Sequence, residues 1–160
     1  MLYDAPIELI TPTTVKPEWI DYNGHMNVAF YVLAFDEAID KIYEELGLGP
    51  VYRNHTNQST FALEGHIQWI REIKLGDFMQ FTAQLLDCDT KRLHFFLTMK
   101  HAEKKYLAAT YENLSMHVDL ATRRASAFPN EIQGRINTLM QSHKPLAKPK
   151  QVGSIVGIRR

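Results

Sequence analysis

Residues 28–47 contain the feature that most restricts how this chain can fold, a helical pattern whose first half is apolar on every side. Apolar residues recur at the spacing of an amphipathic helix, and a glycine follows the pattern. The recurring positions are Tyr31, Ala34, Phe35, Ala38, Ile42 and Leu46, and the glycine is Gly47. Charged residues begin only at Asp36. The N-terminal half of this helix is therefore expected to be buried all round.

Strand-like segments lie on both sides of this helix in the sequence. Residues 7–15 are rich in Ile, Thr and Val and predict a first strand. Four longer runs follow the helix, at 60–74, 77–89, 93–100 and 106–119, and the turn signals between them indicate an antiparallel meander. This order predicts an α+β fold, in which a long antiparallel sheet wraps around a central apolar helix.

The C-terminal part predicts a closing helix and a tail. Residues 129–141 have one apolar face, formed by Ile132, Ile136, Leu139 and Met140. Residues 142–160 contain five basic residues and two prolines, which favours an extended basic tail. With 160 residues the chain fits one domain, which we place at 1–141.

Composition excludes several classes of protein. Eighteen basic residues balance eighteen acidic ones, which argues against a nucleic-acid-binding surface. No stretch approaches the roughly 18 apolar residues of a membrane-spanning helix. Cys88 is the single cysteine, and the N-terminus lacks the pattern of a secretory signal, so we predict a cytoplasmic protein. Asp21 and His25 are four residues apart, but no paired histidines or cysteine cluster predict a metal site.

The loop from Asp21 to Asn27 precedes the apolar helix and carries the groups that an attack on a carbonyl needs. Asp21 can attack directly or activate a water, and free N–H groups at the helix start can stabilise an oxyanion. Gly24 permits a positive φ, Asn27 can cap the helix, and His25 can orient the loop or the substrate. The alternative is a purely structural turn and cap, because Asp, Asn and Gly are ordinary turn residues.

The segment Trp19-Ile20-Asp21-Tyr22-Asn23-Gly24-His25-Met26-Asn27 resembles hotdog-fold thioesterases related to 4-hydroxybenzoyl-CoA thioesterase, with their Asp-x-x-Gly-His-x-Asn signature. The resemblance covers roughly residues 11–129 and includes Gly76-Asp77 at a turn. It implies the hotdog fold and hydrolysis of an acyl-CoA thioester, with Asp21 as base or nucleophile. It also implies no cofactor beyond the CoA of the substrate, and a homodimer or homotetramer with the site between subunits.

A narrower resemblance points to the thioesterases of carnitine breakdown, which hydrolyse betainyl-CoA to glycine betaine. It rests on residues 20–35, Leu63-Glu64-x-His66, His117-Val118-Asp119-x-x-Thr122-Arg123-Arg124 and Phe128-Pro129. Two alternatives stay open. One is a non-catalytic acyl-CoA-binding hotdog protein, and the other is a hotdog hydroxyacyl-CoA dehydratase, which would carry its catalytic Asp and His on the helix.

Further candidates come from the strands. Alternation puts Glu64 and His66 on one face of the strand 60–74. They can form a second acid/base pair of the site or a polar pair at a dimer interface. The opposite face would hold Phe61, Leu63, Gly65, Ile67 and Trp69. Alternation also groups Asn113 with the polar residues of the strand 106–119, and we include it among the substrate-binding candidates.

The substrate suggests the remaining candidates. Arg123 and Arg124 can contact the CoA phosphates, although each can also be a solvated charge. A trimethylammonium group favours an aromatic cage, for which Trp19, Tyr22, Phe30, Tyr31 and Trp69 are candidates, unless they are core. Gly24, Met26 and Val28 complete the predicted substrate-binding set.

Overall fold

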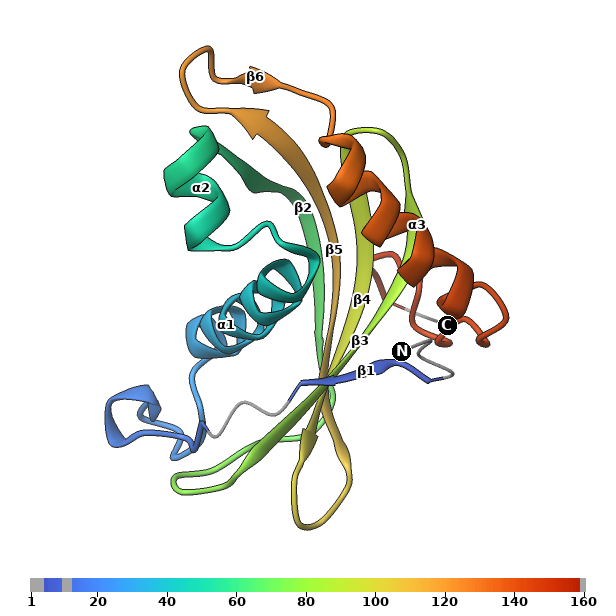
Figure 1. Cartoon of the computed structure of the whole chain (residues 1–160). Helices are drawn as coiled ribbons and strands as arrows, with labels where there is room; N and C mark the ends of the chain where they lie inside the picture. The colour runs from blue at the N-terminus through green and yellow to red at the C-terminus, as the bar shows by residue number, and fades with distance from the viewer. Residues whose placement is uncertain (1–4, 10–12, 159–160) are drawn as a thin grey trace.

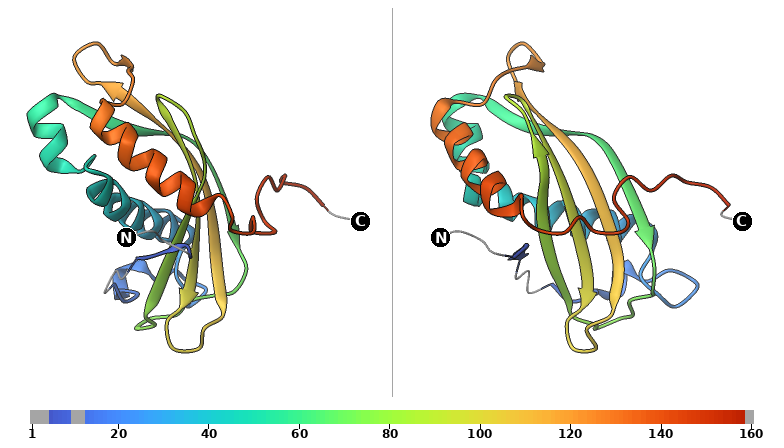
Figure 2. Two further views of the ribbon diagram at one scale, coloured as in Figure 1. Left: turned by 45° about the vertical axis from the view of Figure 1, so that its right-hand side comes forward. Right: turned by 90° about the vertical axis from the view of Figure 1, so that its right-hand side faces the viewer.

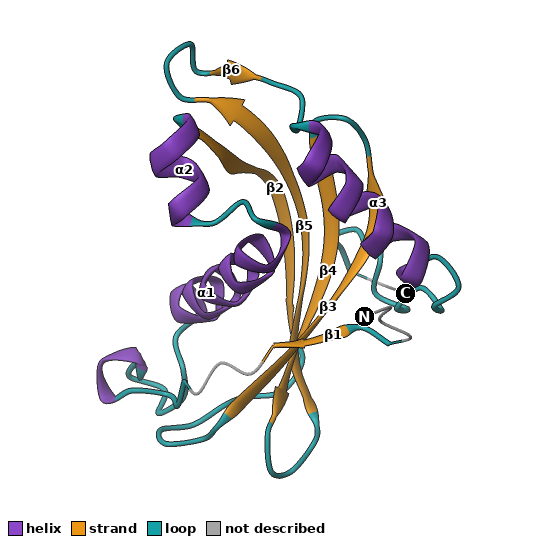
Figure 3. Cartoon of the chain, viewed as in Figure 1, coloured by secondary structure: helices purple, strands orange, loops and turns teal. Residues whose placement is uncertain are grey.

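The computed structural model describes residues 5–9 and 13–158, and in this part of the chain one antiparallel sheet wraps around a long helix (Figures 1 and 3). The sheet order is β1-β3-β4-β5-β2, and the short β6 pairs with β5. The strands are β1 (Ile7–Leu9), β2 (Gln58–Trp69), β3 (Met79–Cys88), β4 (Arg92–His101), β5 (Leu107–Asp119) and β6 (Arg124–Ala125). The helices are α1 (Val28–Leu46), α2 (Pro50–Thr56), α3 (Asn130–His143) and the 3-10 helix η1 (Pro17–Trp19). This is the hotdog fold, as predicted.

Helix α1 has the predicted ends. The Asn27 side chain accepts a hydrogen bond from the Ala29 N–H at 3.0 Å, and Gly47 ends the helix with a φ of 83°. On its buried side Phe35 packs against Phe81 of β3, with ring centroids 5.6 Å apart. The capping signals were readable in the sequence because they depend on local backbone chemistry alone.

The expectation that the first half of α1 is buried on every side is wrong for the single chain. Val28 is 52% exposed and Val32 is 44% exposed. The sheet covers α1 from one side only (Figure 1), so apolar residues on the other side face solvent. Strand β2, at the edge of the sheet, is also open, with Leu63 50% and Trp69 52% exposed. The molecule therefore presents an apolar surface along α1 and β2.

The predicted four-strand meander is correct only for β3, β4 and β5. Strand β2 pairs with β5 rather than with β3, so it forms the far edge of the sheet. It also ends at Trp69 instead of Lys74, because the chain then turns beneath α1, where the Ile73 N–H donates to the Tyr31 hydroxyl at 3.1 Å. This connection carries the chain from one edge of the sheet to β3 on the other side.

A register shift between Ala62 and Glu64 changes the faces predicted for β2. Phe61 pairs with Met116, on the face away from α1, whereas Gly65 pairs with Asn113, on the face toward α1. Phe61 and Gly65 were predicted to share a face. Simple alternation fails there because a bulge inserts one residue and so exchanges the two faces.

Three smaller features differ from the sequence prediction. Strand β1 covers only Ile7–Leu9 of the predicted 7–15, and residues 10–12 lie outside the described part. Helix α2, which begins with Pro50 after Gly49, was not predicted, nor was β6. Helix α3 has the predicted apolar face but extends to His143.

Residues 144–158 contain neither helix nor strand and cross the face of the sheet that α1 does not cover (Figure 2). The Gly153 N–H donates to Glu112 Oε2 at 2.8 Å and so fixes this segment to β5. None of the described helices is both long and apolar enough to cross a membrane.

Candidate active site

The loop between η1 and α1 is a tight turn closed by its own backbone. The Asp21 N–H donates to the His25 carbonyl at 3.1 Å, and the Gly24 N–H donates to the Asp21 carbonyl at 3.0 Å. Gly24 has a φ of 79°, the left-handed conformation that glycine adopts without strain. Gly24 is therefore needed for the turn itself.

Two backbone hydrogen bonds fix this loop to its surroundings. The Asn27 N–H donates to the Trp19 carbonyl at 2.8 Å, and the Met26 N–H donates to the Ile73 carbonyl at 3.0 Å. The Met26 side chain is fully buried. Because one bond closes the turn and the other fixes it to Ile73, the Asp21 side chain has a defined position relative to α1.

The two carboxylate oxygens of Asp21 differ in their contacts. Oδ1 accepts the Asn23 N–H at 2.8 Å, a hydrogen bond that orients the carboxylate. Oδ2 lies 3.5 Å from Asn27 Nδ2, which is long for a hydrogen bond. Oδ2 is therefore the oxygen open to a water or a substrate.

The N-terminus of α1 leaves one donor beside this loop. The N–H groups of Ala29 and Phe30 bond to the side-chain and backbone oxygens of Asn27, both at 3.0 Å. Among the described residues no acceptor is bonded to the Val28 N–H, the first N–H of the helix. The helix dipole adds positive potential at this end, so the Val28 N–H is suited to an oxyanion.

A cavity of about 210 Å³ adjoins the start of the helix. Its lining includes His25, Val28, Tyr31, Trp69 and Arg71. His25 Nδ1 lies 3.1 Å from the Met26 carbonyl oxygen, which assigns the proton to Nδ1. The Tyr31 hydroxyl accepts from the Ile73 N–H, and burial raises the pKa of Tyr31, so this phenol stays neutral. His25, Val28, Tyr31 and Trp69, all sequence candidates, thus lie together.

Other candidates lie elsewhere in the chain. Glu64 and His66 do share a face, but it is the sheet face away from α1, where they line a separate cavity with His94 and Glu112. The structure does not bring them to Asp21. The described residues contain no group of three or more His, Cys, Asp or Glu placed to hold a metal ion.

The aromatic candidates do not form a cage in the single chain. Trp19 is buried and stacks on Phe30, with ring centroids 5.5 Å apart, so the two rings cover each other. Tyr22 is 97% exposed at the tip of the loop. Arg123 lies in the turn between β5 and β6, and Arg124 begins β6, at the opposite end of the molecule from the loop (Figure 1).

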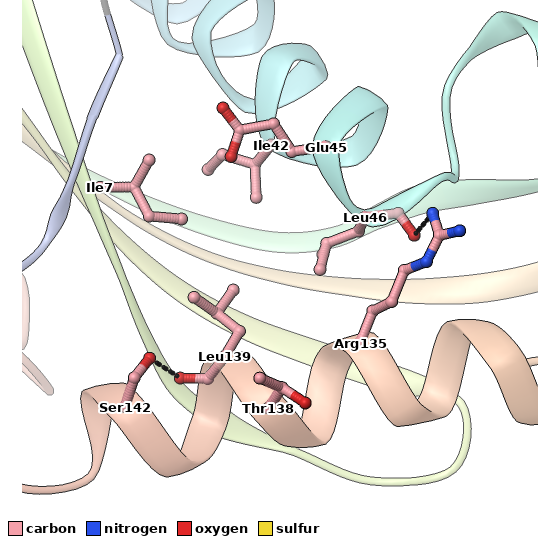
Figure 4. Close-up of a pocket in the computed structure, with 8 residues that line it drawn as sticks. All are labelled: Ile7, Ile42, Glu45, Leu46, Arg135, Thr138, Leu139 and Ser142. Atoms are coloured by element: carbon pink, nitrogen blue, oxygen red, sulfur yellow. Dashed lines mark hydrogen bonds between the residues drawn. The ribbon is translucent and has the colours of Figure 1, made fainter. Parts of the chain in front are cut away.

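Another cavity, of about 190 Å³, lies between β1, α1 and α3 (Figure 4). Ile7, Ile42 and Leu139 line it, and Arg135 donates across it to the Leu46 carbonyl at 3.4 Å. None of the candidate residues lines this cavity, so we interpret it as the packing seam of α3.

Comparisons with known proteins identify the family of this chain. Residues 15–136 match the family model of the thioesterase-like superfamily. The betainyl-CoA thioesterase of Pseudomonas aeruginosa is 36% identical, over 91% of this chain and 92% of that protein. The L-carnitine dehydrogenase/betainyl-CoA thioesterase of Rhizobium meliloti is 32% identical over 98% of this chain, which spans 31% of that longer protein. A Staphylococcus aureus protein solved in complex with CoA superposes with a TM-score of 0.88 at 32% identity, covering 96% of this chain and 97% of that one. The chain belongs to the thioesterase-like superfamily.

Proposed function

We propose that this protein hydrolyses acyl-CoA thioesters to a free acid and CoA, with Asp21 as the catalytic residue. The observation that carries this proposal is the pairing of an open carboxylate oxygen, Asp21 Oδ2, with an unbonded helix N–H, that of Val28. The carboxylate provides the base or nucleophile, and the N–H provides the donor for the oxyanion.

Two routes use these groups. In one, Asp21 takes a proton from a water, whose oxygen adds to the thioester carbonyl while the Val28 N–H binds the developing oxyanion. The carbon–sulfur bond then breaks, and the proton goes to the leaving thiolate. In the other, the Asp21 carboxylate itself attacks the thioester carbonyl and CoA leaves as the thiolate. Water then cleaves the anhydride formed between Asp21 and the acyl group. Incorporation of ¹⁸O into Asp21 in a single turnover in labelled water would indicate direct attack.

For the acyl group we propose betainyl, with glycine betaine as the product. Support comes from the 36% identity to the Pseudomonas aeruginosa betainyl-CoA thioesterase over nearly the whole chain. The other curated relatives combine the same activity with L-carnitine dehydrogenase on one longer chain. The CoA complex of the Staphylococcus aureus structure supports CoA as the carrier.

We further propose that the protein is a homodimer or homotetramer built on the edge strand β2. A long edge strand with exposed Leu63 and Trp69 is a template for pairing with a second copy. Antiparallel pairing about a two-fold axis would place the two α1 helices side by side and cover Val32 and Leu33. It would also bring Arg123 of one copy toward the loop of the other, where CoA phosphates would lie.

The dehydratase alternative conflicts with the composition of α1. Such an enzyme would need both an aspartate and a histidine on the helix, and α1 contains no histidine. The non-catalytic alternative leaves the open Asp21 carboxylate without a role.

A panel of betainyl-, short aliphatic and aromatic acyl-CoAs tests the proposal by release of free thiol. We expect thiol release from betainyl-CoA above all. With a 2-enoyl-CoA added to the panel, loss of its enoyl absorbance by hydration without thiol release would support the dehydratase instead, and binding of CoA without either change would support the non-catalytic protein. Failure on betainyl-CoA alone would remove the narrower assignment.

A further inference from the structure

A further cavity beside α1, of about 390 Å³, lies on the side of the helix that faces β2. It is formed by the C-terminal half of α1, the start of α2 and the α1-facing side of β2 and β5. Its lining combines acidic, aromatic and amide side chains with one basic side chain, and includes Asp36, Asp40, Tyr43, Arg53, Tyr111 and Asn113.

The aromatic walls of this cavity are held in place. The Tyr43 hydroxyl donates to Ser115 Oγ at 2.8 Å, and burial raises the pKa of Tyr43 to about 12, so it stays neutral. The Tyr111 ring lies over Gly65, where any Cβ would meet the ring at 2.6 Å. The Tyr111 hydroxyl in turn accepts from Asn113 Nδ2 at 2.9 Å. The wall is therefore preformed.

One polar atom of this wall lacks a partner. Asn113 is only 2% exposed, and its Oδ1 has no hydrogen-bond partner among the described residues. A buried carbonyl oxygen left without a partner costs free energy. A ligand that presents positive charge to Asn113 Oδ1 would remove this cost.

The charges around the cavity are predominantly negative. Asp36 and Asp40 are one helical turn apart on α1, and neither forms a salt bridge within the described residues. Glu44, in the same row, pairs with Lys41. Arg53 is the cation among the lining residues, and its guanidinium donates to Asn54. Two uncompensated carboxylates therefore favour a cationic ligand.

We infer that this cavity binds the quaternary ammonium head of the acyl group, an inference that rests on the proposed function. The methyl groups around a quaternary nitrogen carry its positive charge and would contact Tyr111 and Asn113 Oδ1. Asp36 and Asp40 supply the opposite charge. The substrate head would thus be recognised here rather than by the aromatic residues near Asp21.

The cavity cannot serve the Asp21 of its own chain. Asp36 and Asp40 follow Val28 by eight and twelve residues on α1, which is about 12 and 18 Å along the helix axis. In a betainyl thioester the nitrogen is one methylene from the reacting carbonyl. The head must therefore occupy the cavity of one copy while the carbonyl lies at the Asp21 of a second copy, beside it in the antiparallel dimer.

A pair of isosteric substrates tests the charge recognition directly. Betainyl-CoA and 3,3-dimethylbutanoyl-CoA have the same shape, but only the first is cationic. We expect wild type to have the higher kcat/KM for betainyl-CoA. In Asp36→Asn and Asp40→Asn the ratio of the two kcat/KM values should fall by about tenfold each, the order expected for one partly screened charge pair. Glu45→Gln, on α1 but outside the cavity, should keep the wild-type ratio.

An unchanged ratio in both variants, with both substrates still hydrolysed, would overturn the inference and leave the proposed function intact. Hydrolysis of neither substrate by wild type would instead overturn the proposed function.

Binding of tetramethylammonium, measured by calorimetry against sodium at equal ionic strength, does not depend on catalysis. Wild type should bind it and Asp36→Asn/Asp40→Asn should not; equal binding would contradict the inference.

Mixed dimers test whether the two halves of the site come from different copies. In such a dimer one copy carries Asp21→Asn and the other carries Asp36→Asn/Asp40→Asn. If the site is shared, the intact Asp21 of the second copy acts beside the intact cavity of the first. If each site belongs to one copy, no site has both an intact Asp21 and an intact cavity. We expect the isolated mixed dimer to have the wild-type substrate ratio. A ratio that stays at the level of the double variant would contradict the shared site.

Discussion

Asn27 links the Asp21 carboxylate to the start of α1. Its Nδ2 lies 3.5 Å from Asp21 Oδ2, while its Oδ1 accepts the Ala29 N–H at 3.0 Å. One side chain thus lies between the proposed base and the start of the helix that carries the proposed oxyanion donor, the Val28 N–H. The two contacts can be separated by substitution.

Asn27→Ala removes both contacts of this side chain. It should cost about 1 kcal/mol of stability through loss of the helix cap, with a large loss of activity. Asn27→Asp keeps an acceptor for the Ala29 N–H but puts a second negative charge beside Asp21. Its thermal midpoint should stay near that of wild type while kcat falls. If Asn27→Asp were fully active, the contact with Asp21 would have no role in catalysis.

Gly65 makes room for the Tyr111 ring. In Gly65→Ala the new Cβ would meet Tyr111 at 2.6 Å, so the ring must move, at a cost of about 1–3 kcal/mol. Gly134→Ala in α3 is the matched control, because no atom lies within 4 Å of its Cβ, and it should gain about 0.5–1 kcal/mol. Urea unfolding of the two variants measures both; equal effects would contradict the close packing at Gly65.

Asp40 should destabilise the free protein at neutral pH. Partial burial raises the pKa of Asp40, and the negative charges of Asp36 and Glu44 raise it further. The carboxylate nevertheless still reaches solvent. The folded state thus disfavours ionised Asp40, a penalty that is present above the carboxyl titration range and absent below it, where both states are protonated. The charged groups that face it from α1 and α2 are Asp36, Glu37, Lys41, Glu44 and Arg53.

Asp40→Asn should accordingly be more stable than wild type at pH 7, by at most about 0.5 kcal/mol because the group is largely exposed. The gain should vanish as the pH falls through the carboxyl range. Thermal midpoints from pH 3 to 8 measure this, with Glu45→Gln as control. A gain that grew toward low pH would have the wrong sign for this account.

The exposed apolar surface of α1 and β2 should be an interface. Val32→Glu places a charge on it and should yield a monomer in sedimentation velocity, with activity reduced at least about 100-fold because the site is shared. Val156→Glu, an exposed valine on the C-terminal segment, should leave assembly and activity unchanged. A monomeric Val32→Glu protein with full activity would rule out a shared site.

The sequence predicted the features that depend on local chemistry. Asn27 and Gly47 mark the ends of α1, Gly24 marks the positive φ of the loop, and the apolar row on 129–141 marks the buried face of α3. Strand limits were close for β3, β4 and β5, because each is bounded by charged or turn-forming residues.

Long-range pairing was not predictable in the same way. The position of β2 beside β5 depends on how the connection after Trp69 crosses beneath α1, which no local pattern reveals. The bulge near Leu63 reversed part of the face prediction for β2, and no local sequence pattern indicates this bulge either. Asp36 and Asp40 resemble a solvated helix face in sequence, and only the opposing Asn113 distinguishes them.

The comparison of Asp21→Asn with Glu18→Gln tests the central claim most directly, by thiol release from betainyl-CoA. Asparagine can still accept the Asn23 N–H that Asp21 Oδ1 accepts at 2.8 Å, so the loop should keep its shape and the protein its thermal midpoint. We predict that Asp21→Asn lowers kcat by about 100- to 10,000-fold, as expected for loss of a general base or nucleophile. Glu18→Gln, an exposed carboxylate three residues earlier, should be as active as wild type. Thiol release by Asp21→Asn at the wild-type rate would contradict the account.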